Sequence, residues 1–402
     1  MKSKLLQILY RLPITFFTFS CLVLLSSCAH TPTEPKPFQF DTAIRTLAQD
    51  LLKQVNDHHD DSDQSTANIV IDPFFDANSG EVLNVSKQIE AIFFEEQQKS
   101  FPHISLKPLR SDTLMDAQYI LRGEIRLDRL KSEKTDQKLY HVLASVDNRK
   151  RVVALADVWV SEKNLDYTGA GIHADTPMFI IDPLREKARA IIESRVKASV
   201  EPESAAFLET KAILVEAGDA YENKDYKKAL RLFEQAAKQD DGQVMETYAG
   251  LYLTHYVLNQ KRQAEVAFAQ LVDISVTKTG SLSVKFLFEV NQADFLKNEN
   301  LRTQYYIWIK KIGEYFRHSN TCLQIVGHCS KTGPAEWNDK LSEKRAQRIQ
   351  NLMRRSFPEI KQHSQAIGKG YHENIVGTGT DDERDALDRR VEFILTDCSA
   401  IK

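Results

Sequence analysis

The sequence predicts a multidomain α/β protein: an N-terminal α/β domain, a central pair of α-helical repeats and a C-terminal α/β sandwich with a mixed sheet. Its 402 residues suffice for about three domains of ordinary size. Strand-like and helical apolar patterns alternate in the first and last parts, whereas residues 204–278 are helical throughout. Hydrophobic residues make up 42% and charged residues 27%, a balance that excludes a wholly disordered or multispan membrane protein.

Residues 1–27 are typical of a signal peptide. Lys2, Lys4 and Arg11 precede an apolar run, residues 14–25, which is shorter than the roughly 18 to 20 residues that span a bilayer. The run ends in Leu-Ser-Ser-Cys at residues 25–28, which resembles the lipobox of bacterial lipoproteins. That resemblance implies that Cys28 carries a diacylglycerol and further acyl chains such as palmitate, enough for stable anchoring. The alternative is an ordinary secretory signal that contains a cysteine.

The residues after Cys28 indicate where the anchor would lie. Ala29 stands where an aspartate would favour the inner membrane, so the resemblance implies the periplasmic face of the outer membrane. Residues 28–39 are proline-rich and form a predicted tether. Lys and Arg number 53 against 56 Asp and Glu, so no basic excess is available for nucleic acid.

The segment 40–200 reads as the N-terminal α/β domain. The pattern predicts helices at 40–55 and 85–98, with strands at 68–71, 104–106, 117–127, 140–146 and 152–160. The phrases NIVIDPFFDANSGEV, DAQYILRGEIRL and VVALADVWV resemble a family of periplasmic lipoprotein domains that includes CsgG, LpoB and FlgO. The resemblance implies binding to other envelope proteins, and it carries over no catalytic residue.

Residues 204–278 repeat. KKALRLFEQA at 227–236 aligns with RQAEVAFAQL at 262–271, which places Ala229 and Phe233 35 residues before Ala264 and Phe268. This period is close to that of tetratricopeptide (TPR) repeats, in which small residues stand where two helices cross. Two repeats are too few to bury a solenoid core, so they should pack on a neighbouring domain or a capping helix. A plain helical spacer is the alternative to a peptide-binding groove.

The C-terminal segment, residues 283–397, begins with a predicted strand in VKFLFEVNQADF, followed by a helix at 301–316. Next come a strand, a loop and a helix in LQIVGHCSKTGPAEWNDKLSEKRAQRIQNLM, and a last strand, DRRVEFIL, at 388–395. The blocks Gly-His, Asn, Leu-Ser-x-x-Arg-Ala and Arg-Arg-Val stand in register with the OmpA-like peptidoglycan-binding domain, which the whole segment resembles. That resemblance implies non-covalent binding of the diaminopimelate side of the peptidoglycan stem peptide.

The same resemblance marks the ligand residues as Ser330, Asn338, Leu341, Arg345 and Arg389. Asn338 is expected to cap the helix that follows it. A guanidinium at Arg345, beside an apolar helix face, is costly unless an anion meets it, and a carboxylate suits its fork. The alternative is that Arg345 pairs with an internal acid such as Glu392. Arg389 is a second candidate contact for the ligand carboxylate, or is structural and held by Asp388.

Two positions depart from the family pattern. Ser330 replaces the aspartate that meets the ammonium group of diaminopimelate, with Cys329 in the threonine place, and Asp388 replaces an asparagine. A serine can hydrogen-bond an ammonium group but cannot neutralise it, so weaker binding or a different stem peptide is expected.

Cys322 begins one predicted strand and Cys398 follows the last, so the two would be close if those strands ran side by side. A disulfide between them is possible in an oxidising periplasm, and two free thiols are the alternative. Cys329 would be left over, either buried or facing the ligand loop.

Sequence motifs for catalysis are missing. We find no His-Glu-x-x-His, phosphate loop, Gly-x-Ser-x-Gly or Cys-x-x-Cys, and His58-His59-Asp60-Asp61 lies in a stretch that reads as a solvated loop. We therefore expect a non-enzymatic outer-membrane lipoprotein without cofactor or metal. It would bind peptidoglycan and hold periplasmic or outer-membrane proteins. The alternative is a component or regulator of a secretion, flagellar or wall-synthesis machine whose C-terminal domain binds protein.

Overall fold

The computed structural model describes residues 36–60, 66–131, 136–181, 183–289, 291–317, 322–375, 379, 385 and 388–401. The predicted signal peptide, Cys28 and most of the tether lie outside these residues. The described residues belong to one compact unit, residues 36–402. None of its described helices combines the length and the apolar character that a membrane span requires.

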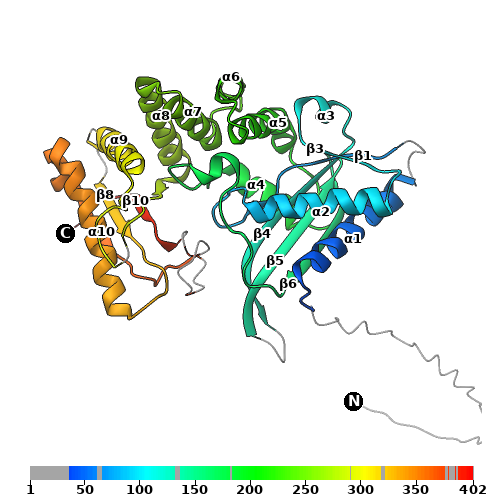
Figure 1. Ribbon diagram of the computed structural model, residues 1–402, viewed down its shortest axis with the longest axis horizontal. Coiled ribbons are helices and arrows are strands. Elements are labelled where there is room, and N and C mark those ends of the chain that lie inside the picture. Colours follow the sequence, from blue (N-terminus) through cyan, green and yellow to red (C-terminus); the bar gives the residue numbers. More distant parts are fainter. Residues whose placement is uncertain are drawn as a thin grey trace, which may run out of the picture. The chain divides into compact units, whose positions relative to one another are not determined.

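The N-terminal domain is built on one mixed sheet, in the strand order β3-β1-β4-β5-β6 (Figure 1). β1 runs parallel to both of its neighbours, whereas β4, β5 and β6 form an antiparallel meander, and the short β2 pairs with β4. The strands are β1 (Asn68–Ile71), β2 (Phe75–Asp76), β3 (Ser105–Pro108), β4 (Tyr119–Lys131), β5 (Asp136–Asp147) and β6 (Val152–Val160). All five predicted strands are therefore present, three of them longer than predicted.

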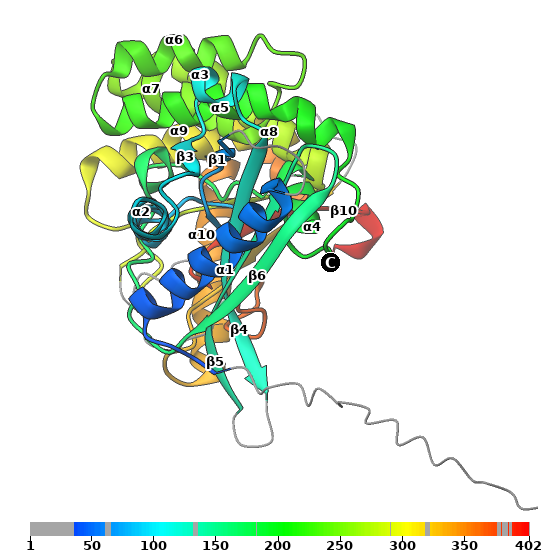
Figure 2. The same cartoon turned by 90° about the vertical axis from the view of Figure 1, so that its right-hand side faces the viewer.

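Two long helices, α1 (Phe40–Asp60) and α2 (Asn84–Ser100), provide the apolar cover of this sheet. Figure 2 shows α1 lying across β6 and β5, which agrees with the contacts between these elements. Ile44, Leu47 and Leu51 recur at helical spacing on α1 and are fully buried. α1 runs five residues beyond its predicted end, so His58 and His59 lie on a helix and the loop predicted there is wrong. The sequence pattern also missed two short helices, α3 (Ser111–Met115) and α4 (Pro183–Ile192).

Three glutamates of this domain have raised pKa values: Glu81 and Glu124 are buried, and Glu90 is partly buried. Burial raises the pKa of Glu81, Glu90 and Glu124 to about 7 each, although nearby cations or hydrogen bonds partly oppose the rise. A carboxyl whose pKa is raised by folding destabilises the folded state when it is ionised. The stabilising protonation is therefore complete at low pH and is lost as the pH rises through about 7.

We expect Glu90→Gln to raise the melting temperature at pH 8 and to leave it nearly unchanged at pH 5. Burial dominates the pKa of Glu90, whose carboxyl accepts a hydrogen bond from the Phe74 N–H, and an amide can keep that bond. Thermal unfolding followed by circular dichroism between pH 5 and 8 measures the effect. Wild type should lose stability across this range more steeply than the variant. Parallel profiles would show that folding does not shift the pKa of Glu90.

Four helices occupy the central segment: α5 (Pro202–Glu222), α6 (Tyr226–Ala236), α7 (Met245–Val257) and α8 (Lys261–Thr279). Each is in contact with the next, and Figure 1 shows them side by side. The small and aromatic residues of the 35-residue repeat, Ala229, Phe233, Ala264 and Phe268, are all fully buried. A Cβ at Gly250 would lie 2.2 Å from the Phe233 ring, so only glycine allows this approach between α6 and α7. The two helix pairs stand where the repeat predicts them, and their assignment to the TPR class stays a prediction.

The helix pairs share their core with the next helix of the chain, α9 (Glu299–Phe316), which packs on α8. Trp308 donates an indole N–H bond of 2.6 Å to the Tyr252 hydroxyl, which in turn donates to the Gln304 side chain at 2.9 Å. Trp308 also stacks on Phe268, with 6.1 Å between ring centroids. A following helix thus covers the end of the pair, as two repeats require.

The C-terminal domain is an α/β sandwich whose sheet has the order β7-β10-β8-β9. β8 and β9 are parallel and the other pairs antiparallel, so the sheet is mixed as predicted. Its elements are β7 (Ser281–Val284), β8 (Cys322–Gly327), α10 (Ala335–Ser356), the 3-10 helix η2 (Pro358–Gln362), β9 (Ser364–Gly368) and β10 (Val391–Thr396). The sequence pattern predicts an opening strand from Val284 onward, whereas β7 ends at that residue, so the predicted position is wrong.

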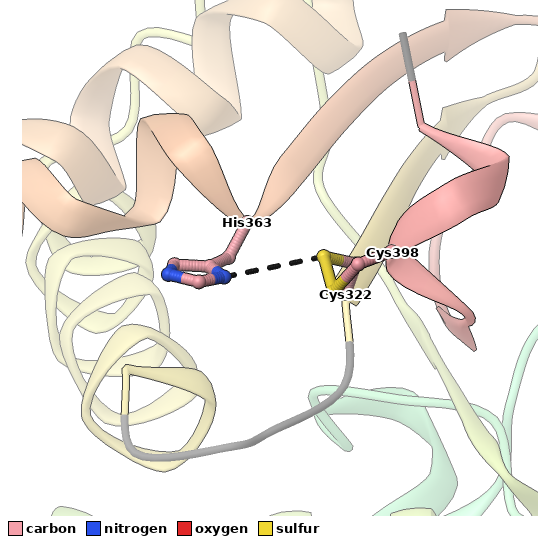
Figure 3. Close-up of side chains that lie close together, drawn as sticks. All are labelled: Cys322, His363 and Cys398. Atoms are coloured by element: carbon pink, nitrogen blue, oxygen red, sulfur yellow. Dashed lines mark hydrogen bonds between the residues drawn. A yellow bond between two sulfur atoms is a disulfide. The ribbon is translucent and has the colours of Figure 1, made fainter.

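A disulfide joins Cys322, the first residue of β8, to Cys398, two residues beyond β10 (Figure 3). The antiparallel register of β8 and β10 pairs Cys322 with Thr396, which brings the two cysteines together. Of the two alternatives, the structure has the disulfide. Cys329 takes no part in this disulfide and is buried.

Candidate functional site in the C-terminal domain

Four of the five predicted ligand residues, all except Arg389, lie where β8 passes through the loop 328–334 into α10. A Cβ at Gly327 would lie 2.2 Å from the Ser342 carbonyl oxygen, so the end of β8 and the helix are in close contact. The fully buried Ser342 hydroxyl accepts a hydrogen bond from the Gly370 N–H at 2.9 Å. Gly327, Ser342 and Gly370 thus allow close packing of β8 against α10, and separating the two elements would cost buried contacts. The loop between them is held by this packing.

Asn338 holds the loop in a way that differs from the prediction. α10 begins at Ala335 with Pro334 in the capping position, so Asn338 lies inside the helix and the prediction that it caps the helix is wrong. Proline is pre-organised for a helix start, which explains the earlier beginning. The Asn338 amide nitrogen donates back to the carbonyls of Thr332 at 2.6 Å and Pro334 at 3.2 Å. Its role in this structure is to shape the loop.

Arg345 lies two turns further along α10, and its side chain is buried. Its Nε donates to the Gln292 carbonyl at 3.1 Å, and its Nη2 lies 3.5 Å from the Glu289 carbonyl. Its guanidinium stacks on Phe288, 4.9 Å from the ring centroid. Backbone carbonyls and an aromatic face therefore surround the guanidinium, whose burial the sequence analysis expected to cost free energy. Glu392, the internal acid considered as its partner, pairs elsewhere.

Cys329 connects Arg345 to the loop. Its buried Sγ lies 3.6 Å from Arg345 Nη1 and donates toward the Asn338 carbonyl at 3.7 Å. The next residue, Ser330, is 5% exposed, and its hydroxyl lies 3.4 Å from that of Thr332. Leu341 is buried one turn before Arg345. Ser330, Asn338, Leu341 and Arg345 thus belong to one cluster, as the sequence motif implies.

Glu392 of β10 forms a second charged group at the start of the loop 328–334, together with His328 and Arg390. His328 is buried, and its Nε2 lies 3.4 Å from a Glu392 oxygen. The other Glu392 oxygen accepts a 2.6 Å bond from Arg390 Nε. Burial opposes ionisation of Glu392, but His328 and Arg390 outweigh it and lower its pKa to about 2. Glu392 is therefore ionised at neutral pH, and its two oxygens face His328 and Arg390.

Arg389 is the fifth predicted ligand residue. It lines a cavity of about 560 Å³ together with Lys285 and Tyr305, and neither Ser330 nor Arg345 lines this cavity. Asp388, considered as its structural partner, is fully buried and accepts a 2.6 Å bond from the Ile375 N–H. The two readings of Arg389, a second contact for the ligand carboxylate or a structural residue held by Asp388, both stay predictions.

Comparison with known protein families finds a match in the C-terminal part of the chain, which contains the candidate site. The OmpA family matches residues 288–387, about a quarter of the chain. Residues 288–387 form an OmpA-like domain. No curated protein sequence matches the chain.

Several solved structures are similar to part of this chain. An outer membrane protein from Borrelia burgdorferi is 26% identical over 29% of this chain and 88% of its own, with a TM-score of 0.22. The cell wall anchor of the type VI secretion system from Pseudomonas aeruginosa is 22% identical over 29% of this chain and 81% of its own, with a TM-score of 0.24. The peptidoglycan-associated lipoprotein from Burkholderia pseudomallei is 23% identical over 28% of this chain and 89% of its own, with a TM-score of 0.22.

Sequence reasoning missed part of the OmpA-like site. Phe288, Glu289 and Gln292, which contact the Arg345 guanidinium, lie more than 50 residues before it. Two of them act through backbone carbonyls, which any residue type provides, so no side-chain pattern could have found them. The aromatic residue at 288, in FEVNQADF, is the one signal available in the sequence.

Proposed function

We propose that this protein is an outer-membrane lipoprotein, without enzymatic activity, whose OmpA-like domain binds peptidoglycan non-covalently. Its N-terminal domain and helix pairs would hold periplasmic protein partners. The observation that carries the proposal is the OmpA match over 288–387 together with the position of Arg345, whose guanidinium contacts the loop 328–334 at Cys329. The lipid anchor at Cys28 rests on the lipobox resemblance in the sequence.

The chemistry of Arg345 suits a carboxylate of the stem peptide. Its guanidinium has five N–H donors, and the acceptors around it include neutral backbone carbonyls and a thiol. A carboxylate adds the attraction between two opposite charges, which neutral carbonyls lack, so it competes well for these donors. Ser330 is in the same cluster and offers a hydroxyl to the ligand's ammonium group.

We expect wild-type protein, as residues 29–402, to co-sediment with purified sacculi, and Arg345→Ala to bind roughly 10- to 100-fold more weakly. The lost interaction is a charge-assisted hydrogen bond of about 1.5–3 kcal/mol. Ser330→Asp should bind more tightly than wild type because an aspartate neutralises the ammonium group. Supernatant and pellet fractions at increasing sacculus concentration give the apparent affinities.

Matched controls make this experiment specific. Arg355→Ala removes the same charge from an exposed position on α10 and should leave binding unchanged. Because Arg345 and Ser330 are both buried, circular dichroism must show that Arg345→Ala and Ser330→Asp are folded. Ser330→Asp tests the site while the Arg345 guanidinium is kept. If wild type stays in the supernatant and Ser330→Asp does not recover binding, peptidoglycan is not the ligand. Release of soluble muropeptides would contradict the absence of enzymatic activity.

A second function is favoured by Ser330 itself. Without the family aspartate, the site loses its anion for the stem-peptide ammonium group, and the OmpA-like domain could serve a protein ligand in a secretion, flagellar or wall-synthesis machine. In-cell crosslinking from an exposed position near the site, such as Trp337, distinguishes the two. Crosslinks to one defined protein, together with no sedimentation on sacculi, would support this second function.

A further inference from the structure

The cysteines of the disulfide lie beside a histidine that the proposed function does not use. Cys322 Sγ, Cys398 Sγ and a ring nitrogen of His363 are all within 4.8 Å of one another, and His363 Nδ1 is 4.0 Å from Cys322 Sγ (Figure 3). A disulfide sulfur is a weak hydrogen-bond acceptor, so this contact does little to hold the imidazole in place. The three side chains come from β8, from the junction between η2 and β9, and from the turn after β10.

We propose that reduction of the Cys322–Cys398 disulfide converts this group into a Zn²⁺ site with two thiolates and one imidazole as ligands. Reduction by a dithiol transfers two electrons: the S–S bond breaks, each sulfur gains a proton, and the dithiol becomes a disulfide. Zn²⁺ then displaces the two thiol protons. A Cys₂His ligand set is borderline-soft and suits Zn²⁺ rather than Mg²⁺ or Ca²⁺, and a water can complete the tetrahedron.

Backbone hydrogen bonds that do not involve the disulfide hold the three ligands near one another. The His363 carbonyl accepts a 2.8 Å bond from the N–H of Leu323, the neighbour of Cys322. Cys322 is paired with Thr396 in the β8–β10 ladder, two residues before Cys398. Reduction therefore leaves both thiols and the imidazole in place, and the sulfurs need only separate to roughly 3.8 Å, the spacing set by two Zn–S bonds.

The group is accessible from solvent both to a reductant and to a metal ion. His363 and Cys398 are exposed, whereas Cys322 is buried, so a reductant and a hydrated metal ion reach the group from one side. The remaining thiol of the described residues, Cys329, is buried against Arg345 and Asn338 and is held away from solvent. The disulfide would thus act as the state that excludes metal, and the reduced state as the one that binds it.

Spectroscopy with Co²⁺, followed by Zn²⁺ competition, tests the proposal on residues 29–402. Reduced wild type should show thiolate-to-cobalt charge-transfer absorption that Zn²⁺ abolishes, and oxidised protein should show none. His363→Ala should weaken Zn²⁺ binding roughly tenfold or more, and Cys398→Ser should remove it. Cys329→Ala and His372→Ala, an exposed histidine of the same domain, serve as controls that should bind like wild type.

The results that overturn the proposal are equally specific. Unchanged affinity in His363→Ala would mean that the thiols bind metal without the imidazole, so the three-ligand site does not exist. Loss of the cobalt signal in Cys329→Ala, or no signal in reduced wild type that is folded by circular dichroism, would also reject it. Sedimentation on sacculi is a separate readout, so failure here leaves the proposed peptidoglycan binding untouched.

Discussion

Replacing Cys322 and Cys398 together by alanine is expected to lower the free energy of unfolding of the C-terminal domain by about 4 kcal/mol. The disulfide closes a loop of 76 residues that contains β8, α10, β9 and β10. In the chain-entropy model, a loop of this length removes about 4 kcal/mol of conformational freedom from the unfolded state. Alanine is preferred to serine because Cys322 is buried, and a hydroxyl there would add a desolvation cost.

Native-state hydrogen exchange of the β8 and β10 amides, with EDTA present to exclude metal, measures this effect. The variant should lose protection at Gln324 and Phe393, which lie in the β8–β10 ladder. Amides of β5 in the N-terminal domain should keep theirs. Cys329→Ala, which removes a thiol but no crosslink, is the matched control. A loss below about 1 kcal/mol would show that the disulfide does not limit the unfolded chain, contrary to the chain-entropy model.

The sequence predicted most elements because their apolar patterns are long and regular. The first half of β4 is buried on both faces, whereas residues 152–160 and the helical spacing of Ile44, Leu47 and Leu51 each bury one face. The structure has a strand or a helix at each predicted place. The patterns did not reveal α3, which has only five residues. Helix ends were also uncertain, since the polar residues after Val55 continue α1 for five more residues.

The site illustrates a different limit. Motif spacing placed Ser330, Asn338 and Arg345 together because helix and loop geometry relate positions near in sequence. It could not show that Pro334 begins α10 and turns Asn338 into a loop anchor. Nor could it bring His363 to Cys322, because that contact depends on the parallel pairing of β8 with β9. Contacts set by sheet order are not readable from one sequence.

A buried charge cluster joins α4, α5 and α7 and gives the second large effect. Glu246 of α7 accepts a 3.1 Å bond from Arg185 Nη2 and a 2.9 Å bond from Lys211 Nζ, and all three side chains are buried. Burial opposes ionisation of Glu246, but Lys211 and Arg185 outweigh it and lower its pKa to about 2. Burial also lowers the pKa of the neighbouring His173 to about 3, so this imidazole is neutral and Glu246 is the anion that faces both cations.

We expect Glu246→Gln to lower the free energy of unfolding by roughly 3–5 kcal/mol, because two buried cations lose their anion. Urea unfolding at pH 7 measures the loss. Glu336→Gln, which breaks an exposed ion pair with Lys340, is the control and should change stability by less than about 1 kcal/mol. A loss as small as that control's would mean that water or another acid neutralises the cluster.

The pH dependence of the same variant separates charge from packing. A carboxylate whose pKa folding lowers contributes stability that is complete above its unfolded pKa of about 4.3 and is lost as the pH falls toward 2. Wild type should therefore lose its advantage over Glu246→Gln between pH 4.5 and pH 2 on this basis, because both chains are neutral at position 246 in acid. Replacing Arg185 and Lys211 by methionine together with Glu246→Leu should recover most of the stability, since a buried ion cluster is often matched by apolar residues of similar volume. If that triple variant is as unstable as Glu246→Gln, shape rather than charge determines how the three helices pack.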